Sequence, residues 1–330
     1  MRILRVLAAA LAASLLLAAC GNSPDATGST DAASDTTTEE ALGEVPAEAG
    51  GAIEIDGSST VAPLTEAIAE EFANVGNATQ VNVGTSGTGG GFERFCDGET
   101  DISDASRPIK DEEAQLCADA GVEFTELRVG TDALTVVVNP ANDFATCLTF
   151  DQLITIFGAP GVENWSEVDP SFPDLPLSVF APDADSGTFD FFLETLGIDE
   201  EPGARPAYNA SADDNVIVTG VQGEEGGWGY FGFAFFQNNA EALTAVEVDG
   251  GDGCTAPSVE TAQDGSYPLT RPLLIYVKNE ALARPEVQAF ASYYLATVGS
   301  VIVEVGYIPE PDTDLAEAAA TLAGAIAAAG

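Results

Sequence analysis

The sequence predicts an α/β protein with two lobes joined by two strands. The chain has 330 residues, of which 45% are hydrophobic, and this is enough for one large or two ordinary cores. From Ile53 onward, short β-rich runs alternate with helical patterns, which is typical of helices that flank a sheet. Two β-rich runs, 129–138 and 267–278, indicate that the chain leaves a first lobe and later returns to it. Two such crossings make a hinge.

The N-terminal residues have the pattern of a secretory signal. Arg2 and Arg5 precede an apolar run over 6–19 that is too short for a comfortable membrane span. Small residues come directly before Cys20, as in the bacterial lipobox, so we expect a signal peptide over 1–20 and lipidation of Cys20. A plain signal peptide with an incidental cysteine is the alternative. Residues 21–50 have almost no large apolar group and predict a disordered tether.

The strands and helices of the two lobes follow from residue patterns. β-rich runs predict strands over 52–55, 80–83, 133–138, 177–180, 245–248 and 273–277. Apolar residues on one face predict helices over 64–72 after Thr60, 189–196 before Gly197 and 287–298 after Pro285. The alanine-rich tail, 310–330, is either a surface helix or frayed. We place lobe I at 51–132 and 267–330, and lobe II at 133–266.

Charge and composition exclude several classes of function. The chain has 54 acidic and 10 basic residues, a net charge of −44, so a nucleic-acid backbone would be repelled. Because the chain has no histidine, Ser-His-Asp and Cys-His catalysis and HExxH metal sites are excluded. We interpret the acidity as a strongly hydrated surface rather than an interaction face. The sequence predicts no enzyme activity, no cofactor and no metal site.

Four cysteines follow Cys20, namely Cys96, Cys117, Cys147 and Cys254. In an exported protein an even number favours two disulfides, and the absence of a CxxC pair disfavours zinc. Three pairings are possible. We choose Cys96–Cys117 and Cys147–Cys254, because each bond would then crosslink residues within one predicted lobe.

Three turns rich in glycine and hydroxyl groups each lead from a strand toward a helix. They span 56–63 (DGSSTVAP), 84–92 (GTSGTGGGF) and 183–188 (DADSGT). Each could be an ordinary helix cap or a flexible loop, and the second lacks the lysine of a nucleotide-binding loop. Their recurrence is more informative, because helix N-termini offer free N–H donors and partial positive charge to an anion.

One arginine lies beside these turns in the sequence. Arg107 follows a strand-like piece at Asp101-Ile102 and precedes Pro108, so its guanidinium could bind a tetrahedral oxyanion with two hydrogen bonds. A surface salt bridge is the alternative. In an acidic protein, an anion site needs a fixed cation of this kind.

Together, several segments resemble the substrate-binding lipoproteins of bacterial phosphate ABC importers, the PstS family, from Ile53 to about Pro311. These segments are IDGSSTVAPL, GTSGTGGGFERFCDGETDISDASRPIKDEE, DADSGTFDFFLE, DDNVIVTGV, GGWGYFGFAFF and YPLTRPLLIYV. The resemblance implies a type II periplasmic-binding fold, whose two lobes are mixed sheets flanked by helices and close on a phosphate. It also implies an extracytoplasmic, lipid-anchored receptor, in the periplasm or at the cell surface, that delivers phosphate to the permease subunits of an importer. We expect a monomer.

The resemblance also implies which residues bind phosphate. By the family's motifs these are Ser59 or Thr60, the Val61 amide, Thr88, Ser186, Gly187 and Thr188. We also expect Ser106 to bind phosphate, although many members carry at its position an aspartate that accepts the phosphate proton. Pro182 is a second departure, since it stands where members carry an arginine. We expect Arg107 to supply the missing cation, and Asp185 or Asp104 to supply the proton acceptor, which distinguishes hydrogen phosphate from sulfate.

Three other functions remain open. A receptor of the same fold could bind sulfate, molybdate or tungstate. A phosphoesterase could use Ser186 or Ser59 as nucleophile, with Lys110, Lys278 or a carboxylate as base, but neither lysine lies within the three turns. Adhesion or sensing at the cell surface is indicated only by the tether and the charge.

Overall fold

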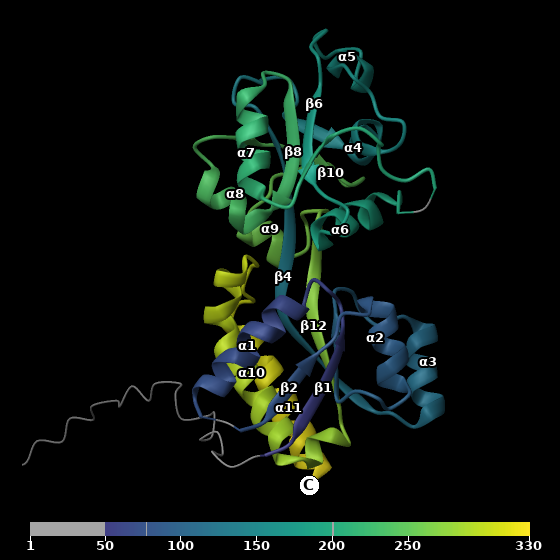
Figure 1. Ribbon diagram of the computed structural model, residues 1–330, viewed down its shortest axis with the longest axis vertical. Helices are drawn as coiled ribbons and strands as arrows, with labels where there is room; N and C mark the ends of the chain where they lie inside the picture. Colours follow the sequence, from purple (N-terminus) through teal and green to yellow (C-terminus); the bar gives the residue numbers. More distant parts are fainter. Residues whose placement is uncertain (1–49, 77, 200) are drawn as a thin grey trace, which may run out of the picture. The chain divides into compact units, whose positions relative to one another are not determined.

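The computed structural model describes residues 50–76, 78–199 and 201–330. The predicted signal peptide, the lipidation of Cys20 and the tether up to residue 49 lie outside the described residues. Figure 1 shows the order of the helices and strands along the chain. Among the described helices, none combines the length and the apolar character that crossing a bilayer requires.

One mixed sheet of nine strands passes through most of the described chain (Figure 1). Its strand order is β2-β1-β3-β12-β4-β8-β6-β7, and β9 pairs with β4. The strands are β1 (Ala52–Gly57), β2 (Gln80–Val83), β3 (Ile102–Ala105), β4 (Phe124–Val138), β6 (Ser178–Pro182), β7 (Asn209–Ser211), β8 (Gly227–Gly232), β9 (Thr244–Ala245) and β12 (Thr270–Lys278). A second sheet, in the order β11-β10-β5, contains β5 (Cys147–Thr149), β10 (Glu247–Asp249) and β11 (Cys254–Thr255).

The first half of the large sheet is covered by helices on both faces. Alternate side chains of β12 point to opposite faces, so Leu273 and Ile275 join one core while Leu274 and Tyr276 join another. The helices of the first core are α1 (Ala62–Asn74), α10 (Pro285–Val305) and α11 (Asp312–Ala329). Those of the second are α2 (Gly87–Cys96) and α3 (Asp111–Ala120), which the Cys96–Cys117 disulfide joins.

Strand β4 belongs to both halves of the sheet. It is antiparallel to β12 from Phe124 to Ala133 and antiparallel to β8 from Leu134 to Val138. The chain therefore continues from one set of neighbours to the next without leaving the β conformation, and β12 returns beside it.

The second half is also covered on both faces. One core contains Val136, Trp165 and Phe192, and the other contains Val137 and Phe231. The helices are α4 (Phe150–Phe157), α5 (Trp165–Val168), α6 (Gly187–Leu196), α7 (Asp214–Gly223), α8 (Phe233–Asn239) and α9 (Val259–Gln263). A short 3-10 turn, η2 (Ala281–Ala283), precedes α10 and packs in the core of the first half. The Cys147–Cys254 bond joins β5 to β11, so both predicted disulfides are present.

The two-lobed α/β fold predicted from the sequence is confirmed. One predicted strand is divided in the structure, and one open alternative is decided. The strand predicted over 245–248 is two strands, because the chain changes partner at Val246: β9 pairs with β4, whereas β10 pairs with β5. The alanine-rich tail, for which two alternatives were open, forms the helix α11, and its Leu322 packs into the core beside α10.

Candidate functional site

The predicted turns lie where parallel strands end. Strands β2, β1 and β3 are parallel neighbours, so their carboxyl ends lie at one edge of the sheet. The chain leaves this edge at residues 58–61, 84–86 and 106–107, and β6 likewise leads into residues 183–186. Ligands of open α/β sheets bind at such edges.

The first turn connects β1 to α1 and is held by its own backbone. The Ser58 N–H donates to Asp104 O at 2.8 Å, and the Ser58 hydroxyl accepts from the Thr60 N–H at 3.2 Å. The Val61 N–H, a predicted phosphate donor, donates to Ser58 O at 3.1 Å in this structure. Ser59 is exposed, whereas the Thr60 residue is only 6% exposed. The side chain of Ser59 is therefore accessible from the edge, and Thr60 faces inward.

The second turn is anchored by Asp56, a residue to which the sequence assigned no role. One carboxylate oxygen of Asp56 accepts from the Ser86 N–H at 2.8 Å and from the Ser86 hydroxyl at 2.7 Å, and the other binds Arg94. Burial alone would raise the pKa of Asp56, but the bonds from Ser86 and the charge of Arg94 hold this pKa below its usual value. An ionised Asp56 thus fixes the start of α2.

Thr88 and Ser106 are brought together by this anchoring. Their hydroxyl oxygens lie 3.1 Å apart, and the Ser106 N–H donates to Thr88 Oγ1 at 3.2 Å. Both residues are partly exposed. Two of the predicted phosphate-binding hydroxyls therefore form one pair, supplied by α2 and by the end of β3.

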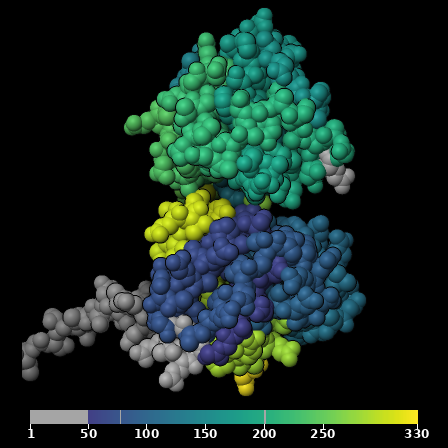
Figure 2. All heavy atoms as spheres, in the orientation of Figure 1, coloured from purple at the N-terminus to yellow at the C-terminus, as the bar shows by residue number. Residues whose placement is uncertain are grey.

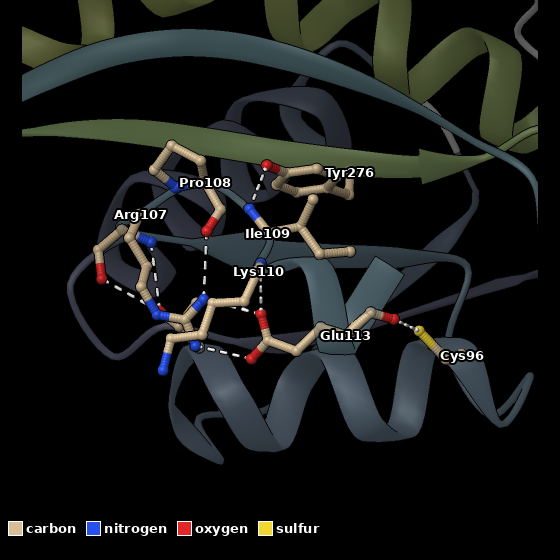
Figure 3. Close-up of polar contacts among 9 residues, drawn as sticks. Cys96, Arg107, Pro108, Ile109, Lys110, Glu113 and Tyr276 are labelled. Atoms are coloured by element: carbon tan, nitrogen blue, oxygen red, sulfur yellow. Dashed lines mark hydrogen bonds and ion pairs between the residues drawn. The ribbon is translucent and has the colours of Figure 1, made fainter. Parts of the chain in front are cut away.

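Figure 3 shows how Arg107 is bound. Its two terminal nitrogens donate to the two carboxylate oxygens of Glu113, at 2.7 and 2.8 Å, and one of them also contacts Pro108 O at 3.2 Å. Glu113 in turn accepts from the Lys110 N–H at the start of α3. Burial opposes ionisation of Glu113, but the bonds from Arg107 and Lys110 lower its pKa. The Arg107 guanidinium, which was predicted to bind an anion, binds the Glu113 carboxylate in this structure.

The third turn caps α6. The Ser186 hydroxyl accepts from the Thr188 N–H at 3.2 Å, which is ordinary N-cap geometry, and α6 begins at Gly187. The Asp185 N–H donates to the Asp183 carboxylate at 3.2 Å, and the Asp185 side chain is exposed. Pro182, which lies before this turn, accepts a hydrogen bond from the Tyr208 hydroxyl through its carbonyl.

Arg271 connects the first turn with the third. It lies on β12, and one terminal nitrogen donates to Thr60 Oγ1 at 2.7 Å and to Gly187 O at 3.2 Å. Its Nε donates to the Asp132 carboxylate at 3.0 Å, and its guanidinium lies 4.0 Å from the centre of the Phe191 ring. At 8% exposure, Arg271 is a buried cation. It is the cation that the structure brings to two of the predicted turns.

One pattern in the sequence could have identified Arg271. Its segment, YPLTRPLLIYV, contributes to the family resemblance and contains one of the few arginines of an acidic chain, placed within a β-rich run. A charged residue at such a position is unusual unless it is paired. Only the fold, however, brings Asp132 and Thr60 to it.

Asp104, one of the two predicted proton acceptors, lies beneath the edge rather than on it. It is fully buried, and neither carboxylate oxygen makes a hydrogen bond of normal geometry to a described group. Burial raises its pKa to about 7, the carboxylates of Asp56 and Glu66 add to the rise, and the Thr65 hydroxyl opposes it. The other predicted acceptor, Asp185, is exposed at the third turn.

The fold and these turns define a class of protein: a two-lobed α/β binding protein with polar turns at the carboxyl ends of its parallel strands. The chain belongs to the PBP superfamily, since a family model described as a PBP superfamily domain matches residues 27–297.

Individual relatives are similar over most of their length. Protein SphX of Synechococcus elongatus is 46% identical over 261 residues, which cover 78% of this chain and 77% of SphX. The phosphate-binding protein PstS of Staphylococcus saprophyticus is 39% identical over 310 residues, covering 93% of this chain and 90% of that protein.

Two solved structures are similar over most of this chain. A possible phosphate binding protein from Planctomyces limnophilus has a TM-score of 0.81 and 41% identity, and the match covers 84% of this chain and 99% of the other. An ABC-type phosphate transport receptor from Vibrio cholerae has a TM-score of 0.62 and 25% identity, covering 78% and 99%.

Proposed function

We propose that this protein is an extracytoplasmic receptor that binds inorganic phosphate and delivers it to an ABC importer. Relatives named for phosphate binding cover most of the chain, and this supports the choice of ligand. The observation that carries the proposal is the position of Arg271, whose guanidinium contacts Thr60 of the first turn and Gly187 of the third. A buried cation at the meeting point of two helix starts suits a desolvated anion.

In this proposal three groups of donors surround the phosphate. Ser59, Thr60 and the Val61 amide come from the first turn, Thr88 and Ser106 from their hydrogen-bonded pair, and Ser186, Gly187 and Thr188 from the third turn. Several of these donors have internal partners here, so they would exchange those partners for phosphate oxygens. Such an exchange keeps these donors hydrogen-bonded.

The cation of the site has two candidates. Arg271 is buried and already contacts two of the turns, whereas both terminal nitrogens of Arg107 bind Glu113, which offsets the charge of Arg107. We therefore propose Arg271 as the principal cation. The proton acceptor is Asp185, which lies beside Ser186, or Asp104, which is buried beneath the first turn.

Several finer features belong to the same proposal. The lobes span 51–132 with 267–330, and 133–266. Cys20 carries a lipid, so the protein is tethered to the membrane by that anchor alone, and it acts as a monomer without enzymatic activity. A receptor for sulfate, molybdate or tungstate is the alternative, and competition by these ions would distinguish it.

Calorimetry with two matched variants tests the site. We expect Arg271→Gln to weaken phosphate binding at least 100-fold, because it removes the buried charge, and Arg107→Gln to weaken it less than threefold. The opposite order would make Arg107 the cation. Urea unfolding of both variants separates lost binding from lost folding, and failure of the wild-type protein to bind phosphate would refute the proposed function.

A further inference from the structure

The connection between α10 and α11 bonds to several elements that are distant from it in sequence. We call residues 306–311 the C-terminal link. Residues 307 to 310 of the link bond three different parts of the protein. Tyr307 bonds the first turn, Ile308 and Glu310 bond strand β4, and Pro309 bonds helix α9. Figure 2 shows yellow atoms of the C-terminal chain at the surface between blue and green atoms.

Tyr307 binds the first turn directly. Its hydroxyl donates to Thr60 O at 2.8 Å. Burial and the nearby charge of Asp132 raise the pKa of Tyr307 above its usual value, while Arg271 opposes the rise. The hydroxyl therefore remains a proton donor at every physiological pH.

Ile308 fastens the link to β4. Its N–H and C=O exchange two hydrogen bonds with Thr131, both 2.9 Å long. Its side chain is buried in a small cluster with Ala133 of β4, Phe233 of α8 and Ala262 of α9. The link thus packs against elements of both halves of the sheet.

The next two residues complete the attachment. Pro309 O accepts from the Gln263 side chain of α9 at 2.7 Å. The buried Glu310 carboxylate accepts from Arg128 at 2.9 Å and from the Thr131 hydroxyl at 2.7 Å. Hydrogen bonds of this kind to a charged group are stronger than neutral ones, so the link is held firmly on β4.

Two side chains, Arg271 and Tyr307, bind different atoms of Thr60, and both are anchored on strand β4. Arg271 binds its hydroxyl and is itself held by Asp132, while Tyr307 binds its carbonyl and is held through Ile308 by Thr131. Thr131 and Asp132 are adjacent residues of β4. Because a peptide group is planar, fixing the Thr60 carbonyl also fixes the direction of the Val61 N–H.

We propose that Tyr307 is a positioning residue of the anion site, which sets the place of Thr60 and Val61 relative to Arg271. This inference rests on the proposed function, because it assumes that the first turn binds the anion. Tyr307 would not touch the anion itself. It would lower the cost of ordering the turn when the anion binds, and so would act mainly on the rate of dissociation.

The test compares Tyr307→Phe with Tyr293→Phe. Both remove one tyrosine hydroxyl, but that of Tyr293, on α10, makes no hydrogen bond to another described residue, so Tyr293→Phe is the matched control. We expect Tyr307→Phe to bind phosphate five- to tenfold more weakly, with faster dissociation and an unchanged association rate in stopped-flow measurements. Tyr293→Phe should match the wild-type protein in both rates.

A second variant and two further outcomes decide the proposal. Glu310→Gln keeps the shape of the link but loses its charge, and we expect it to weaken phosphate binding two- to threefold. Wild-type affinity in both link variants, or an equal loss in Tyr293→Phe, would overturn the positioning role while leaving phosphate binding by the wild type intact. If the wild-type protein binds no oxyanion, the proposed function fails and the positioning role falls with it.

Discussion

The Arg271 guanidinium lies 2.7 Å from the Thr60 hydroxyl, although 211 residues separate the two in sequence. The same guanidinium binds Asp132 and lies over the ring of Phe191. One side chain of β12 thereby connects the start of α1 with β4 and with the first turns of α6. This arrangement makes the stability of the protein sensitive to the partners of Arg271.

Asp132→Ala should destabilise the protein. Both partners of the Asp132–Arg271 pair are buried, and removing the carboxylate leaves a buried positive charge without its counter-ion. We expect the free energy of unfolding to fall by about 3 kcal/mol. Urea denaturation measures it, and Asp132→Asn, which keeps a hydrogen-bond acceptor, should lose less. An Asp132→Ala protein as stable as the wild type would mean that the pair contributes nothing.

Asp104→Asn should change how stability depends on pH. The pKa of Asp104 is raised by burial from 3.8 to about 7, so between about pH 4 and pH 7 the folded protein binds more protons than the unfolded chain. The free energy of unfolding therefore falls as the pH rises through this range. Groups facing Asp104 are Asp56 of β1, Glu66 and Thr65 of α1, and Tyr294 of α10.

Asparagine cannot ionise, so the variant should be more stable than the wild type at about pH 8, by on the order of 4 kcal/mol, and the difference should vanish below about pH 4. Urea unfolding at a series of pH values checks this. The exposed Asp97→Asn is the control, since it removes no buried carboxylate. If the free energy of unfolding changed with pH in the same way for Asp104→Asn and the wild type, Asp104 would not titrate between about pH 4 and pH 8.

Gly57→Ala should distort the first turn. Gly57 has a φ of 147°, and a Cβ atom there would lie 2.0 Å from Asp104 O, a backbone atom that cannot move aside alone. Gly98→Ala is the matched control, because Gly98 also has a positive φ but has nothing within 4 Å of its Cβ position. We expect a loss of about 1 kcal/mol for Gly98→Ala and clearly more for Gly57→Ala. If Gly57→Ala and Gly98→Ala had equal urea midpoints, the predicted clash with Asp104 O would be contradicted.

Salt should accelerate phosphate capture. The net charge of −44 repels an anion at long range, and modest salt screens this repulsion beyond about 10 Å. The association rate should therefore rise several-fold between about 10 and 150 mM KCl, whereas steering by a positive surface would make it fall. Stopped-flow measurements at constant pH give the rate. A decreasing rate would show that local positive charge controls the encounter.

Local patterns in the sequence predicted much of the fold. The strand predicted over 80–83 coincides with β2, and the helix predicted over 189–196 is α6, which begins two residues earlier, at Gly187. Strand β8 was not predicted, because its sequence GWGYFG has too many glycines for a strand pattern. The structure explains one of them: a Cβ atom at Gly229 would lie 2.5 Å from Phe180 O on the neighbouring strand.

The site was less predictable, because its contacts are between distant residues. Arg107 pairs with Glu113, only six residues away, and such a local pair is visible in the sequence once α3 is recognised. The partners of Arg271 are 211, 139 and 84 residues away, and no local pattern reports them. The predicted phosphate-binding residues stay predictions until a variant is measured.

The return of β12 between β3 and β4 also affects the order of events during folding. Because the chain is synthesised from its N-terminus, β3 and β4 are made long before residues 270–278. Until then both strands lack β12, which lies between them in the folded sheet. Their unpaired edges would be open to aggregation during that interval. The strand that carries Arg271 is therefore the last to join this part of the sheet. A truncated chain that ends before β12 would leave the edges of β3 and β4 unpaired and prone to aggregate.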